Sequence, residues 1–157
     1  MEKEVQEWME KLKNKEFDLS KQEDLSIALM NLISLEEHFY FSSMKTNNKN
    51  YLDILNSIRT LRKTLLKKIV KNPKGEEWCI SKHLLASSMR LIEVGTKELQ
   101  DNEKEAEMYF KSAFELYSLF FAINLNIIEV KEIKEEKSVF TRKISDIVKK
   151  IVDCCKE

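Results

Sequence analysis

The two histidines of the sequence, His38 and His83, are the side chains best suited to binding a metal ion. His38 directly follows Glu36 and Glu37, so two carboxylates and an imidazole lie together in one segment. Helical bundles that bind iron or manganese through carboxylates take a Glu-x-x-His pair from each of two helices. Leucine and isoleucine occupy the position three residues before the two histidines, so this sequence lacks that pairing.

A divalent-metal site is nevertheless one of two function hypotheses that the sequence supports. Its ligands would come from three expected helices: Glu36, Glu37, His38, His83 and Glu115. If the helices are antiparallel with short turns, His83 lies about eight residues, or about 12 Å, along its helix from the level of His38. One ion could not hold both imidazoles, because Zn–N bonds are about 2 Å long. A ferritin-like, iron-binding bundle is therefore the alternative, and the main hypothesis requires no cofactor.

Acidic and basic residues fall at one level near the middle of the expected bundle. This group consists of Glu36, Glu37, Arg59, Arg62, Arg90 and Glu115. Two carboxylates without a cation between them can have separated pKa values, as acid–base catalysis requires. Carboxylates interleaved with arginines stay ionised and form charge-assisted hydrogen bonds instead. We interpret the group as a structural polar network that fixes helix register, and we assign no catalytic residue.

A basic face follows the third expected helix and its exit. It consists of Arg59, Arg62, Lys63, Lys67, Lys68, Lys71 and Lys74. Several phosphate contacts could form along such a face. The 27 basic residues of the chain are balanced by 27 acidic ones, however, and the sequence carries no recognised nucleic-acid-binding motif. We therefore do not expect nucleic acid as a partner.

The cysteines and the hydropathy pattern indicate the compartment. Cys79, Cys154 and Cys155 form neither a disulfide framework nor the spaced pairs of a zinc site. No apolar stretch approaches the roughly 20 residues that span a bilayer. The first residues alternate in charge and lack the apolar core of a signal peptide. We expect a soluble, cytoplasmic protein without membrane association.

Helices must position all of these side chains. Two glycines and one proline among 157 residues are too few for the turns of a β protein. Apolar residues recur at helical spacing in four long segments and two short terminal ones: 20–46, 50–72, 76–100, 102–125, 2–13 and 138–155. The short turns between the long segments favour antiparallel neighbours. We predict an all-α, antiparallel helical bundle that forms a single domain over residues 1–157.

The leading function hypothesis is a non-enzymatic interaction protein. The absence of a catalytic motif favours it, and so do the apolar stripes of the two terminal segments. These stripes consist of Val5, Trp8, Met9 and Leu12 in the first segment and of Phe140, Ile144, Ile147, Val148, Ile151 and Val152 in the last. Either stripe left in water would form a larger apolar patch than soluble monomers usually tolerate. We therefore expect a homo-oligomer or a complex with another protein.

Overall fold

The structure, a computed structural model, describes residues 19–128 and residue 130. This part of the chain contains four α-helices and no strand: α2 (Ser20–Thr46), α3 (Asn50–Leu66), α4 (Glu77–Glu98) and α5 (Glu103–Asn124). The predicted all-α fold with four long central helices is confirmed. The predicted terminal helices, 2–13 and 138–155, lie outside the described residues. No described helix is long and apolar enough to cross a membrane.

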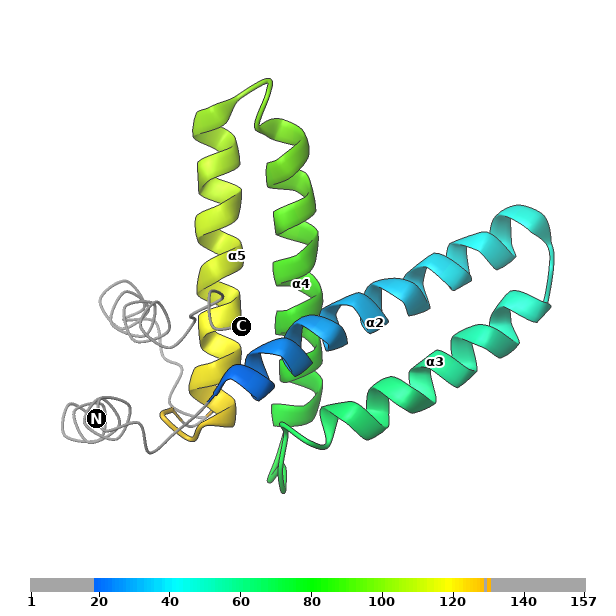
Figure 1. Cartoon of the computed structure of the whole chain (residues 1–157), viewed down its shortest axis with the longest axis horizontal. Helices are drawn as coiled ribbons and strands as arrows, with labels where there is room; N and C mark the ends of the chain where they lie inside the picture. Colours follow the sequence, from blue (N-terminus) through cyan, green and yellow to red (C-terminus); the bar gives the residue numbers. More distant parts are fainter. Residues whose placement is uncertain (1–18, 129, 131–157) are drawn as a thin grey trace.

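The four helices form two antiparallel hairpins that cross each other (Figure 1). α2 packs along α3, and α4 packs along α5, while the hairpins meet chiefly where α2 contacts α4. The α2–α3 hairpin leans away from α4 and α5, so that the turn between α2 and α3 projects far from the other hairpin. The helical bundle is therefore compact at the crossing and open at both turns.

The predicted bounds hold within about two residues for three helices, but α3 is shorter than predicted. It ends at Leu66 rather than near residue 72. The chain then leaves through tight turns, in which the Ile69 amide donates to the Leu66 carbonyl over 3.1 Å. Ile69 and its neighbour Val70 are both buried. Adjacent residues of a continuing helix would point about 100° apart, so the early end allows both side chains to enter the core.

Asparagines shape two of the turns between the helices. Asn102 accepts a hydrogen bond from the Glu105 amide over 3.2 Å and donates one to the Glu105 carboxylate over 3.1 Å. This arrangement caps the first turn of α5. Asn47 ends α2 in the left-handed region with φ 53°. Each turn is short enough to keep its two helices side by side.

Small residues allow the helices to approach closely inside the core. Four fully buried serines lie at the helix contacts: Ser26, Ser81, Ser88 and Ser118. Gly95 of α4 faces the Phe110 ring of α5, where a Cβ atom would lie only 2.8 Å from the ring's Cε1 atom. Larger apolar side chains, such as Leu29, Leu85 and Phe120, fill the space at the crossing. The tight contact between α4 and α5 thus depends on a missing side chain at residue 95.

Candidate functional site

Glu36 of α2 and Arg62 of α3 form the one largely buried ion pair among the described residues. The Arg62 Nε atom donates to Glu36 Oε1 over 2.7 Å, and its Nη2 atom donates to Glu36 Oε2 over 3.1 Å. Only 3% of the Arg62 side chain and 13% of the Glu36 side chain are exposed. This two-point geometry matches the planar guanidinium to the planar carboxylate. The pair therefore joins α2 to α3 at one defined level.

Arg90 and Glu37 form a looser contact between the two hairpins. The Arg90 Nε atom lies 3.6 Å from Glu37 Oε2, and both side chains are about half exposed. The Arg90 Nη2 atom also donates to the Ser34 hydroxyl over 2.7 Å. Exposed pairs of this kind contribute about 1 kcal/mol or less. The contact orients the hairpins but does not hold them together.

The structure does not bring Arg59 and Glu115 into this network. Both side chains are exposed, and neither forms an ion pair with another described residue. Glu115 lies between Ala113 and Tyr117, which are both buried. Alternate residues of a helix point to nearly opposite sides, so Glu115 faces solvent. The six predicted network residues thus divide into two separate pairs and two single side chains.

The five candidate metal ligands do not come together either. Glu37, His38, His83 and Glu115 are exposed, and Glu36 is held by Arg62. Between residues 19 and 128, no three His, Cys, Asp or Glu side chains form a group that could hold a metal ion. The physical reason is that Glu36 faces α3, whereas the side chains of His83 on α4 and Glu115 on α5 face solvent. Cys79 is a free, exposed thiol.

A buried hydrogen bond joins Tyr117 of α5 to Ser26 of α2, and no local pattern in the sequence predicts it. The two hydroxyl oxygens lie 2.6 Å apart, and the Ser26 hydroxyl also donates to the Glu23 carbonyl over 2.6 Å. Because Ser26 has a single hydroxyl hydrogen, Tyr117 is the donor of the bond between them. Burial raises the pKa of Tyr117 to about 12, and the nearby charges of Glu23 and Asp24 add to the rise. A phenol that stays protonated in this way serves as a structural donor rather than a general base.

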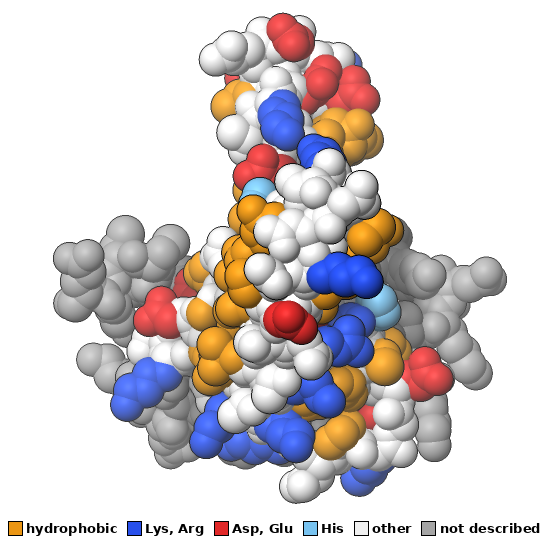
Figure 2. Space-filling model, turned by 90° about the vertical axis from the view of Figure 1, so that its right-hand side faces the viewer, with side chains coloured by type: hydrophobic (Ala, Val, Ile, Leu, Met, Phe, Trp, Pro, Cys, Tyr) orange, Lys and Arg blue, Asp and Glu red, His pale blue; other side chains and the backbone are white. Residues whose placement is uncertain are grey.

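Three large apolar residues of α2 remain exposed near the projecting turn. Tyr40 is 48% exposed, Phe41 50% and Met44 54%. The two aromatic rings pack edge to face with their centroids 5.2 Å apart. Tyr40 and Met44 are four residues apart and therefore neighbours on one face of the helix. We call these three residues the tip surface, and Figure 2 shows hydrophobic side chains continuing along this hairpin.

A groove with basic sides lies where the chain passes from α3 to α4. Lys63, Lys67 and Lys71 line it together with Val70, Asn72, Pro73 and Trp78. Figure 2 shows Lys and Arg side chains gathered over the lower part of the molecule, and acidic side chains gathered at its top. We call this site the basic groove. It combines cations with an apolar wall.

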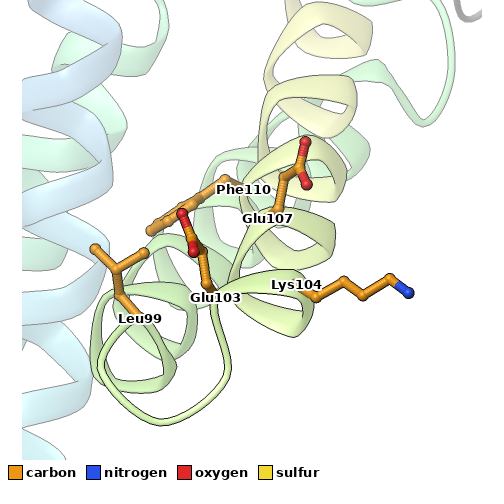
Figure 3. Close-up of a pocket in the computed structure, with 5 residues that line it drawn as sticks. All are labelled: Leu99, Glu103, Lys104, Glu107 and Phe110. Atoms are coloured by element: carbon orange, nitrogen blue, oxygen red, sulfur yellow. The ribbon is translucent and has the colours of Figure 1, made fainter.

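A second hollow lies at the turn between α4 and α5 (Figure 3). Its lining consists of Leu99, Glu103, Lys104, Glu107 and Phe110. In Figure 3 the Lys104 side chain extends away from Leu99 and Phe110. The lining contains two carboxylates and one lysine, so its net charge is negative. We call this site the acidic hollow.

Comparison with known proteins finds no relative of this chain. No protein family, no curated protein and no solved structure matches it. Any function must therefore be inferred from the arrangement of the side chains themselves.

Proposed function

We propose that this chain is a non-enzymatic interaction protein whose projecting α2–α3 hairpin binds another protein chain through the tip surface. The partner is either a second copy or a different protein. One observation supports this proposal above the others: Tyr40, Phe41 and Met44 stand half exposed and adjacent on the part of α2 that extends past the other hairpin. Aromatic residues and methionine are enriched where proteins bind one another.

The size of the tip surface suits an anchor of an interface rather than a whole interface. Covering the exposed half of one such side chain removes about 100 Å² from water, which is worth about 2–3 kcal/mol at about 25 cal/mol per Å². Three side chains thus supply about 7 kcal/mol. Association itself costs an estimated 4–15 kcal/mol. The partner must therefore also contact neighbouring residues such as Leu52 of α3, which is 40% exposed.

The length of the hairpin also favours a binding role. Its contribution to the core ends near the crossing, where Leu29 and Leu66 are fully buried. α2 nevertheless carries the exposed Tyr40, Phe41 and Met44 beyond the crossing, close to the end of the helix. A helix that served only the core would carry polar residues there. Exposed apolar residues that adjoin one another mark a surface that has a partner.

A photo-crosslinking residue tests the proposal directly. Benzoylphenylalanine is placed at Met44 of the full chain, in the cells that naturally produce it, and at Glu115 of α5 as a matched exposed control. Irradiation should crosslink the position-44 variant to a discrete protein band and leave the position-115 variant uncrosslinked. Mass spectrometry then shows whether the captured protein is a second copy or a different chain. Equal labelling at both positions, or none at position 44, contradicts the proposal.

Gel filtration with light scattering provides the second measurement. If the partner is a second copy, the mass should rise above 18.6 kDa with concentration. In about 0.5 M salt, which screens contacts between exposed charges, replacing Phe41 and Met44 by serine should abolish that rise. Replacing Ile27, which is 45% exposed on the same helix but lies outside the tip surface, should leave it unchanged.

A further inference from the structure

The basic groove carries a local excess of positive charge. Residues 63–74 contain five lysines and no acidic residue. All five lysines are exposed, and none forms an ion pair with a described residue. Three of them line the groove beside Trp78 and Pro73. Like charges held close together raise the potential of the site and attract an acidic group.

The acidic hollow carries the opposite charge. Residues 98–107 contain five acidic residues and one lysine. The Leu99 side chain at this hollow is 49% exposed, and the neighbouring Met108 is 50% exposed. Glu107 is paired with Lys111 over 2.9 Å, but both side chains are more than 60% exposed. Exposed pairs are weak and readily exchanged, so Glu107 remains available to a second cation.

The two sites lie at opposite ends of one rigid element. Trp78 is in the first turn of α4, and Leu99 follows directly after its last residue. The 22 residues of α4 place these ends about 33 Å apart at about 1.5 Å per residue. Figure 1 shows α4 running the full distance between them. The two sites of one copy therefore cannot reach each other, whereas the sites of two copies can.

We propose that the turn between α4 and α5, which carries the acidic hollow, docks into the basic groove of the next copy. Carboxylates of Glu103 and Glu107 then meet Lys67 and Lys71, and Leu99 covers the apolar wall around Trp78. Charge complementarity selects a second copy, because both halves of the contact are present on the same chain. The equal numbers of acidic and basic residues leave no net repulsion between copies. Such a head-to-tail contact generates rings or open chains rather than a symmetric dimer.

Sedimentation velocity of the full chain tests this contact. The wild-type protein should form species larger than a dimer at about 0.05 M salt and dissociate at about 0.5 M, because salt screens exposed charges. Two variants each neutralise one side: Lys67→Gln with Lys71→Gln, and Glu103→Gln with Glu107→Gln. Each should weaken association by about tenfold. The control replaces Lys45 and Lys49, at the turn between α2 and α3, by glutamine and should associate as the wild type does.

Mixing the two variants gives the most specific result. Each variant retains one intact side, so the mixture should form a 1:1 complex of twice 18.6 kDa and nothing larger. Circular dichroism of each variant confirms that it is folded. A wild-type protein that stays monomeric at low salt, or a mixture that forms no 1:1 complex, overturns the proposal. So does a monomeric protein that binds a labelled single-stranded oligonucleotide through the lysines, because the occupant of the groove is then nucleic acid.

The tip surface lies outside both docking sites, so this test is separate from that of the hairpin. The Phe41→Ser, Met44→Ser variant should retain salt-sensitive, head-to-tail association. Failure of the mixing experiment therefore leaves the hairpin proposal standing. A hairpin dimer is distinguishable because it stops at two copies and resists salt.

Discussion

Arg62 and Glu36 face each other inside the α2–α3 hairpin through two hydrogen bonds, of 2.7 and 3.1 Å. Buried arginines of this kind need full pairing, since an unpaired charge away from water is costly. The pair also permits only one alignment of α2 against α3, because a slip by one helical turn would separate the two groups by about 5 Å. The pair therefore specifies how α2 aligns with α3, in addition to stabilising the fold.

Breaking this pair should lower the free energy of unfolding strongly. Glu36→Gln leaves the Arg62 charge buried without a counter-ion, and we expect a loss of about 3–5 kcal/mol in urea unfolding. Arg90→Ala is the matched control, because its exposed pair with Glu37 should be worth less than about 1 kcal/mol. A loss at Glu36 no larger than that at Arg90 would show that the buried pair is not needed.

The raised pKa of Tyr117 predicts a loss of stability in alkaline solution. The unfolded chain ionises this phenol near its ordinary pKa of 10.0, whereas the folded chain retains the proton until about pH 12. Stability is therefore complete below about pH 10 and falls as the pH rises toward 12. The loss is about 2–3 kcal/mol, at about 1.4 kcal/mol for each pKa unit. Thermal unfolding followed from about pH 9 to about pH 12 measures this loss, because the range spans both the ordinary and the raised pKa.

Tyr117→Phe is the control for that titration. The variant should be less stable at neutral pH by about 1 kcal/mol, because Ser26 loses its partner. Its stability should then decline less steeply above pH 10 than that of the wild type. Parallel curves for the two proteins would refute the assignment to Tyr117.

The contact between Gly95 and Phe110 predicts a strong coupling between these positions. Alanine at residue 95 improves helix propensity by about 1 kcal/mol, but its Cβ would lie 2.8 Å from the Phe110 ring. Overpacking of this kind costs about 1–3 kcal/mol. We therefore expect Gly95→Ala to bring no gain in wild-type protein and a gain of about 1 kcal/mol when Phe110 is already alanine. A double-mutant cycle measures the difference, and additive effects would mean that the helices have room.

The Asn102 side chain should account for much of the stability of the turn between α4 and α5. Asn102→Ala removes the acceptor for the Glu105 amide and should cost about 1 kcal/mol. Asn102→Ser supplies another acceptor and should cost less than half of that loss. Chemical denaturation of the three proteins side by side decides the question, and equal losses for Ala and Ser would exclude a capping role.

Local signals in the sequence predicted most of the helix bounds. Asn102 interrupts the helical pattern and also caps the N-terminus of α5, so a few residues are enough to predict where α5 starts. The end of α3 could not be predicted in this way, because Ile69 continues the helical spacing of apolar residues past the point where α3 ends. The early end of α3 is explained by the burial of both Ile69 and Val70 in the core. Such burial depends on the other hairpin, which no local pattern describes.

The site shows the same division between local and distant information. Glu36 and Arg62 could be placed at one level because a short turn connects their helices and sets the register. The bond between Ser26 and Tyr117 joins residues 91 positions apart. It depends on the angle at which the hairpins cross, and that angle follows from side-chain packing rather than from periodicity. Arg59 lies three residues before Arg62, on a neighbouring and exposed face of α3.

The crossing of the hairpins implies that backbone amides will exchange their hydrogens with solvent at very different rates. Amides of α2 near Leu29 lie at the crossing and should exchange only when the whole chain unfolds. Amides near Met44 are covered by α3 alone and should exchange through local fraying of the projecting end. Amides at the crossing are thus protected by the whole fold, whereas amides at the projecting end of α2 are protected only by local structure. A partner that binds this projecting end would slow exchange there by orders of magnitude without altering exchange at the crossing.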